Sequence, residues 1–228
     1  MNTFFSYFGS KFRVAKNYRK PQHPWVIEPF AGSAGFSVWH EHPNVVLCDA
    51  DEKICGVWRY LIKASPDELL NLPDIGPGES CRGIGLIPEQ EWLIGFWLTK
   101  GGTIPVVRGS MAKNRDNYLF WGPQIKARLA AQVPKIRNWR VIHGSYNSLK
   151  STGPAHWFVD PPYQNMGKYY KHSNIDFQSL ALWCKSLRGH VTVCEDASAT
   201  WLPFKPLVTN KGARHGSTVE GVWEQDTP

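Results

Sequence analysis

The strongest constraint on the fold is an alternation of short apolar segments with helical patterns. Residues 25–30 (WVIEPF) and 44–50 (NVVLCDA) are apolar and of strand length, and residues 51–63 place apolar side chains at helical spacing. A Gly-rich turn and a helical stretch separate the two strand-like segments. This repeat predicts parallel strands joined by helices, and hence an α/β protein with a doubly wound sheet.

The alternation stops between residues 72 and 138 and then resumes. The interrupting stretch begins with a Gly- and Pro-rich loop and contains two short helical patterns that have no regular place in an alternating sheet. We therefore predict one domain formed by residues 1–71 and 139–228, with residues 72–138 inserted into it. The later elements predicted in that domain are strands at 139–146, 155–163 and 190–196, a helix at 176–187, and a closing hairpin of 204–211 with 217–225.

The basic charge is concentrated in the middle of the sequence. The formal net charge is +7, and residues 80–150 hold 11 Lys or Arg against 3 Asp or Glu. Residues 1–79 hold 8 against 9, and residues 151–228 hold 7 of each. A basic segment with interleaved aromatic residues indicates a surface for nucleic acid, with a solvated loop as the alternative for any single side chain. The candidate contacts are Arg108, Lys113, Arg115 and Lys126, with Trp92, Trp97, Trp121 and Trp139 as aromatic candidates.

Composition argues against several other classes of protein. The longest apolar runs span only a few residues, which excludes a membrane span, and the N-terminal residues lack the apolar core of a signal peptide. The five cysteines are scattered without Cys-x-x-Cys spacing, so we predict neither a disulfide framework nor a zinc site, and no other metal. These features are typical of a protein of the reducing cytoplasm.

Two features fall at the ends of neighbouring predicted strands, where doubly wound sheets bind their ligands. Phe30, Gly32, Ser33 and Gly35 belong to the turn FAGSAG, whose glycines allow a sharp bend and a close approach by a ligand. Its spacing is neither that of the dinucleotide fingerprint nor that of a P-loop. Asp49 ends the next strand and could accept hydrogen bonds from ribose hydroxyls, or cap the following helix. Together these features favour a ligand that contains a nucleoside.

The segment HWFVDPPY supplies a third feature at a strand end. Pro161 and Pro162 lack N–H groups and cannot continue a ladder, which leaves carbonyl oxygens unpaired beside the Asp160 carboxylate. A carboxylate and a carbonyl close together match the two N–H donors of an exocyclic amino group on a nucleobase. Tyr163 offers a ring on which that base can stack.

These motifs resemble those of the Dam-like, α-group DNA adenine-N6 methyltransferases. Residues 160–163 match the family's DPPY motif, and residues 30–35 look like its S-adenosylmethionine loop. Residues 7–11 (YFGSK) are similar to the aromatic-x-Gly-Gly-Lys segment that precedes this loop in the family. The order of the motifs is also that of the family, and the resemblance spans nearly the whole chain outside residues 72–138. It implies a Rossmann-like methyltransferase sheet in which those residues form a target-recognition insertion.

The resemblance also implies roles for individual residues. Asp160, Pro161, Pro162 and Tyr163 would form the catalytic motif. Ser145 is a departure, because the family commonly has an acidic residue at that point of the triplet, here Gly-Ser-Tyr. The residues implied to bind S-adenosylmethionine are Tyr7, Gly9, Lys11, Glu28, Phe30, Gly32, Ser33, Gly35, Asp49, Ser145 and Asp160.

The implied reaction is direct methyl transfer from S-adenosylmethionine to the N6 amino group of adenine in double-stranded DNA, with the base flipped out of the duplex. An amino-methyltransferase acting on RNA or on cytosine N4 is the enzymatic alternative, and an inactive DNA-binding protein with the same fold is the alternative from another class. We expect a monomer with no membrane partner, in the cytoplasm of a bacterium or phage-infected cell, in a restriction-modification or phage setting.

Overall fold

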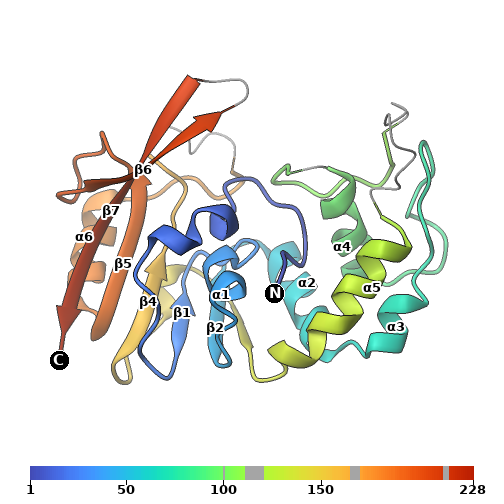
Figure 1. Ribbon diagram of the computed structural model, residues 1–228, viewed down its shortest axis with the longest axis horizontal. Helices are drawn as coiled ribbons and strands as arrows, with labels where there is room; N and C mark the ends of the chain where they lie inside the picture. Colours follow the sequence, from blue (N-terminus) through green and yellow to red (C-terminus); the bar gives the residue numbers. More distant parts are fainter. Residues whose placement is uncertain (100, 111–120, 165–169, 213–215) are drawn as a thin grey trace.

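The structure is a computed structural model that describes residues 1–99, 101–110, 121–164, 170–212 and 216–228 (Figure 1). The described part forms a layered α/β arrangement, with helices packed against a central sheet. No helix of these residues is long and apolar enough to cross a membrane.

The sheet has seven strands in the order β3-β2-β1-β4-β5-β7-β6. The first five in this order are mutually parallel, and β7 runs antiparallel to both of its neighbours. This arrangement confirms the predicted doubly wound, Rossmann-like methyltransferase sheet, closed by the predicted hairpin. The strands are β1 (Val26–Glu28), β2 (Val45–Asp49), β3 (Arg140–His143), β4 (Ala155–Val159), β5 (Gly189–Asp196), β6 (Lys205–Gly212) and β7 (Gly216–Thr227).

Helices cover both faces of the sheet, and β4 shows why. Its five residues are all buried, and alternate side chains of a strand point to opposite faces. Phe158 belongs to one apolar cluster, whereas Trp157 and Val159 belong to the other. The helices are α1 (Gly35–His40), α2 (Glu52–Lys63), α3 (Pro66–Leu70), α4 (Pro88–Leu98), α5 (Pro123–Gln132) and α6 (Phe177–Ser186), with short 3-10 turns η1 (Lys11–Arg13), η2 (Ala15–Asn17), η3 (Val133–Ile136) and η4 (Tyr146–Ser148).

Local sequence accounts for the ends of α2 and α6. Asp51 precedes α2 and its carboxylate accepts a hydrogen bond from the Lys53 N–H at 2.9 Å, while Asp176 caps α6 in the same way through Ser179. A side-chain oxygen at this position satisfies N–H groups that have no partner within the helix. The buried face of α2 carries the apolar residues that the helical spacing predicts.

The region of residues 72–138 shares its core with the sheet. Helix α4 packs on α2, and α5 packs on α3, on the side of the sheet beyond β3 (Figure 1). Leu93, Phe96 and Trp121 belong to the same buried cluster as Val26 and Leu47 of the central strands. The described part of this region therefore packs as an extension of the main core, and its role in target recognition stays a prediction.

Two of the tryptophans proposed to touch nucleic acid are core residues. Trp121 is fully buried and its Nε1 donates to the Pro73 carbonyl at 2.9 Å. Trp139 is 3% exposed and donates to the His42 carbonyl at 3.0 Å. For these two the prediction is wrong, because both ring faces and the indole N–H are used inside the protein. Trp92 and Trp97 are only partly buried.

A histidine in the middle of β4 makes the fold sensitive to acid. His156 is 1% exposed, stacks on Phe36 with ring centroids 5.0 Å apart, and pairs across the sheet with His190. Burial, with a smaller contribution from the charge of His190, lowers the pKa of His156 to about 3. The unfolded chain takes up this proton near pH 6.5, so folding stability falls as the pH drops from about 6.5 towards 3.

Replacing His156 should remove this acid sensitivity. A His156→Phe protein keeps the aromatic packing and has no proton to gain, whereas the wild-type side chain costs about 3 kcal/mol of stability at pH 4 relative to pH 7. Urea unfolding at pH 7 and pH 4 measures the difference between the two proteins. An equally steep loss of stability in both proteins would contradict the assignment.

Candidate active site

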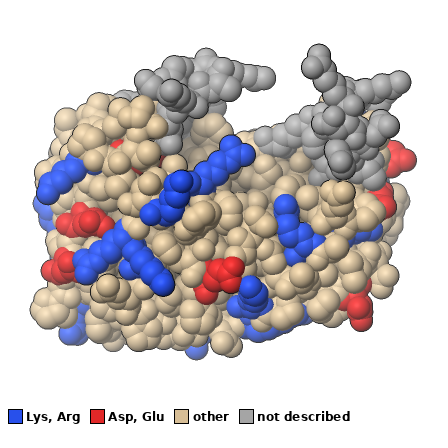
Figure 2. All heavy atoms as spheres, in the orientation of Figure 1, with Lys and Arg blue, Asp and Glu red and all other residues tan. Residues whose placement is uncertain are grey.

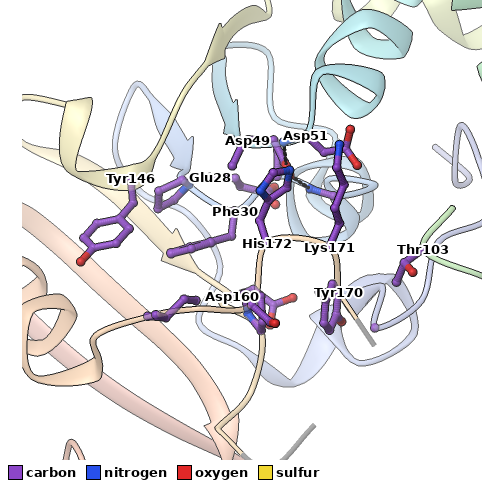
Figure 3. A pocket seen from close by; sticks show the side chains of 18 of the residues that line it. Glu28, Phe30, Asp49, Asp51, Thr103, Tyr146, Asp160, Tyr170, Lys171 and His172 are labelled. Carbon is purple, nitrogen blue, oxygen red and sulfur yellow. Dashed lines mark hydrogen bonds between the residues drawn. The ribbon is translucent and has the colours of Figure 1, made fainter. Parts of the chain in front are cut away.

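A cavity of about 590 Å³ lies at the carboxyl ends of β1, β2 and β4 (Figure 3). In this view Phe30 lies between the acids Glu28 and Asp49 on one side and Asp160 on the other. The same cavity is lined by every residue for which the resemblance implied cofactor binding: Tyr7, Gly9, Lys11, Glu28, Phe30, Gly32, Ser33, Gly35, Asp49, Ser145 and Asp160. Residues from five separate stretches of sequence thus meet at one edge of the sheet, and their binding of a cofactor stays a prediction.

The Gly-rich turn between β1 and α1 is fixed on both sides. Gly32 has φ +44°, a conformation that favours glycine, and the Tyr7 ring lies 3.2 Å from where a Cβ would stand. The Gly32 N–H donates to Asp49 Oδ2 at 2.9 Å, and its carbonyl accepts from Trp58 Nε1 at 2.9 Å. A Cβ on Gly35 would meet the Phe12 backbone nitrogen at 2.5 Å, so this position also requires glycine. The turn therefore holds its backbone close to the cavity.

Asp49 retains the capacity to hold a ligand hydroxyl. Its two oxygens accept from the Gly32 N–H and, at 2.9 Å, from the Asp51 N–H. Each carboxylate oxygen has a second lone pair, so both can accept one further hydrogen bond. Burial raises the pKa of Asp49 to about 6, and the two N–H groups partly offset this. These free acceptor positions fit the hydroxyls of a ribose, which would donate to them, as predicted from the strand position.

Burial favours the protonated form of Glu28. It is 2% exposed, and burial raises its pKa to about 8 although it accepts a hydrogen bond from the Ser37 N–H at 2.9 Å. A neutral carboxylic acid offers both a donor and an acceptor. In this form Glu28 contributes hydrogen bonding to the cavity without adding a further negative charge to those of Asp49 and Asp160.

Asp160, at the end of β4, is held by a buried lysine. Lys11 Nζ lies 2.8 Å from Asp160 Oδ1, donates to the Gly9 carbonyl at 3.2 Å, and lies 3.7 Å from Glu220 Oε1. Burial raises the pKa of Asp160 to about 6, and Lys11 pulls it in the opposite direction. Burial alone lowers the pKa of Lys11, but the carboxylates of Asp160 and Glu220 raise it overall, so Lys11 keeps its charge. The lysine therefore favours the carboxylate form of Asp160.

The rest of the motif divides between two cavities. Pro162 lines the cavity described above, whereas Tyr163 lines a neighbouring one that also contains Lys11 and Tyr170. The Tyr163 hydroxyl donates to Glu220, and the Lys11 ammonium lies 4.7 Å from the centroid of its ring. Pro161 is buried and contacts neither cavity. The stacking of a base on Tyr163 stays a prediction that belongs to the second cavity.

Sequence reasoning missed Glu220 and Tyr170. Glu220 is 7% exposed and accepts hydrogen bonds from Tyr18, at 2.6 Å, and from Tyr163. Its signal was a carboxylate inside the strand-like segment STVEGVWEQ. Tyr170 lines both cavities, and its hydroxyl stands 2.3 Å from where a Cβ on Gly9 would lie. The aromatic pair YY shortly after the DPPY motif was its signal.

The basic residues predicted to contact DNA from the middle segment lie in different environments. Lys126 is buried, with its Nζ 2.7 Å from Asp74 Oδ1 and 2.7 Å from the Leu72 carbonyl, so its predicted contact with DNA is wrong. It lies on the buried side of α5, where its charge is paired. Arg108 is exposed and donates to the Gly78 carbonyl at 2.9 Å, and its DNA contact stays a prediction. Lys113 and Arg115 lie outside the described residues.

Other cations of that segment also serve the protein itself. Arg137 donates to the Ile62 and Ala64 carbonyls at the end of α2, and Lys135 pairs with Glu41 at 2.9 Å. A count along the sequence therefore overstates the basic surface of this region. Among the described residues, no group of three or more His, Cys, Asp or Glu side chains could hold a metal ion.

The sheet order and the site at its carboxyl edge define a chain with the Rossmann-like methyltransferase fold. No protein-family profile matches the sequence, and no curated protein matches it. Among solved structures, it is similar to one described as "Putative methyltransferase yhhF from Escherichia coli", with a TM-score of 0.40 and 10% identity. The match covers 92% of this chain and 77% of that one.

Proposed function

We propose that this protein is an S-adenosylmethionine-dependent methyltransferase that acts on the N6 amino group of adenine in duplex DNA. The observation that carries the proposal is the placement of Asp160, held by Lys11 in a cavity that also contains the Gly-rich turn and Asp49. A carboxylate that lies within reach of a nucleoside site, and that Lys11 holds in its charged form, suits the binding of an exocyclic amine. The DPPY sequence around Asp160 and the motif order support the choice of DNA.

The residues of the site would hold the methyl donor and the target amine next to each other. S-adenosylmethionine, when bound, supplies an electrophilic methyl group on a sulfonium. Asp49 would accept hydrogen bonds from its ribose, and the turn at Gly32 would admit it close to the backbone. The cavity size and the free lone pairs of Asp49 fit such a ligand.

Asp160 would bind and orient the target amine. Its carboxylate and a carbonyl of the following proline segment can accept the two N–H groups, so that the nitrogen lone pair points away from the ring plane. Orientation and charge stabilisation of this kind account for large rate factors without a covalent intermediate. When nitrogen gains the methyl group it must lose a proton, and Asp160 would accept that proton and pass it to water.

The function is tested by incubating the protein with methyl-labelled S-adenosylmethionine and unmethylated duplex DNA. We expect label in the DNA, recovered after digestion to nucleosides as N6-methyladenine. Label in N4-methylcytosine would move the proposal to cytosine, and label in RNA alone would overturn the DNA substrate. Binding of DNA without any transfer would identify the inactive DNA-binding alternative.

A further inference from the structure

A second cavity adjoins the candidate active site and is the larger of the two, at about 970 Å³. It lies between the N-terminal segment, the loop after α4 and strand β7. Residues 7–11 and Tyr170 line both cavities, so the two spaces share a wall that includes Lys11, the ion-pair partner of Asp160. Tyr163 and Tyr170 present aromatic side chains to this second cavity. The DPPY motif therefore borders both cavities, with Asp160 and Pro162 lining the first and Tyr163 lining the second.

The N-terminal segment beside this cavity carries an excess of positive charge. Residues 1–27 contain five Lys or Arg and no Asp or Glu. The sequence count over residues 1–79 concealed this excess, because the acids of residues 28–79 cancel it. Figure 2 shows Lys and Arg side chains gathered on the face along which the N-terminal segment runs in Figure 1.

Three of these five side chains are free to meet a ligand. Lys11 is buried against Asp160, and Arg19 pairs with Asp226 at 2.8 Å. Arg13, Lys16 and Lys20 are exposed, and none of them forms an ion pair with a residue that the structure describes. Arg13 lines the second cavity. We call Arg13, Lys16 and Lys20 the basic row.

The combination of unpaired cations with aromatic rings at a cavity fits a nucleic acid strand. Phosphates are bound by Lys and Arg independently of sequence, and bases stack on aromatic side chains. Of the basic row, Arg13 lines the cavity, and Lys16 and Lys20 are exposed on the residues that follow it in the sequence. Carboxylate ligands would also meet the cations, but they would leave the rings of Tyr163 and Tyr170 unused.

We propose that the basic row binds the phosphate backbone of duplex DNA and directs the target nucleotide into the second cavity, while the donor occupies the first. This inference rests on the proposed function and adds the route by which the substrate approaches Asp160. It assigns phosphate binding to residues outside the inserted region.

The test neutralises the row and compares it with a matched control. The first variant carries Arg13→Gln, Lys16→Gln and Lys20→Gln. The control carries Arg59→Gln, Lys63→Gln and Lys185→Gln, three exposed positions that line neither cavity and that lower the net charge equally. Anisotropy of a labelled 20-base-pair duplex, measured between 50 and 200 mM NaCl, gives the affinity and its dependence on salt for each protein.

We expect the row variant to lose at least about tenfold in DNA affinity, and the slope of log K against log [salt] to become shallower by about 2.7, since each phosphate contact contributes about 0.9. The control should keep the wild-type slope. In methylation assays the row variant should show a raised KM for DNA with little change in kcat, and unchanged binding of S-adenosylmethionine by calorimetry.

The outcomes separate this inference from the proposed function. If wild-type protein methylates DNA and the row variant behaves like the control, the basic row does not bind the DNA backbone, and the proposed function is unaffected. If wild-type protein binds duplex DNA but transfers no methyl group, the proposed function is wrong. The salt slopes of the two variants then still show whether the basic row binds phosphates. A slope change seen only with RNA would overturn the duplex assignment. A wild-type protein with no affinity for the duplex would overturn both.

Discussion

An Asp160→Asn protein should bind S-adenosylmethionine normally and transfer methyl groups about 10²- to 10³-fold more slowly than wild type, the loss typical of one preorganised polar group at a reacting centre. The amide keeps the shape of the side chain and one acceptor, but it carries no charge and cannot take up the amine proton. Transfer is measured with labelled donor at saturating DNA, and donor binding by calorimetry.

Asparagine is preferred to alanine because Lys11 is buried beside Asp160. Removing the side chain altogether would leave a cation with fewer partners, at a cost of about 3–5 kcal/mol for a broken buried pair. Circular dichroism and thermal unfolding report whether the variant is folded. Asp67→Asn, at an exposed position of α3, is the matched control and should keep full activity. A folded Asp160→Asn protein with wild-type transfer would exclude Asp160 from the chemistry.

A Lys11→Met protein should shift the pH dependence of methyl transfer to higher pH. The carboxylate form of Asp160 is required, so wild-type activity should rise with pH through about 6, the pKa that burial and Lys11 together set. An opposite charge at this distance lowers a carboxyl pKa by about 1–3 units. Without Lys11 the pKa of Asp160 should rise by that amount, and activity at pH 7 should fall by between about twofold and about a hundredfold while recovering at alkaline pH.

The conservative variant Lys11→Arg retains the charge and should keep the rising limb of the profile close to that of wild type. The profile is obtained from kcat/KM between pH 5 and 9, with unfolding followed in parallel. A Lys11→Met profile that is lower at every pH but unchanged in position would show that Lys11 acts only through packing. A shifted profile identifies it as a positioning residue for Asp160.

Local patterns were sufficient to predict the fold and to bring part of the lining of the first cavity together, whereas Tyr7, Lys11 and Ser145 were added by the family resemblance. Strands of a parallel sheet all place their carboxyl ends at one edge, so a glycine turn after β1, an acid after β2 and a carboxylate after β4 must meet there. The prediction of Gly32, Asp49 and Asp160 as neighbours required only the strand assignments. The hydrogen bond between Asp49 and Gly32 follows from that geometry.

The remaining features depend on contacts that no local pattern encodes. Lys126 follows a helical pattern like any surface lysine, and only the packing of α5 on α3 shows that it faces Asp74. Glu220 lies 57 residues after Tyr163 and reaches it because β7 inserts between β5 and β6. The basic row was hidden because the charge count over residues 1–79 also included the acids of residues 28–79.

The position of Glu220 on β7 has a consequence for how the site is assembled during synthesis. This one carboxylate contacts Tyr18 near the beginning of the chain, Tyr163 in the DPPY motif, and Lys11 at 3.7 Å. A nascent chain that has reached the end of β5 already contains every residue of the glycine turn and the DPPY motif. It cannot yet anchor Tyr163 through Glu220 or place a second carboxylate near Lys11. The site is therefore completed late, only after residue 220 has left the ribosome and β7 has entered the sheet.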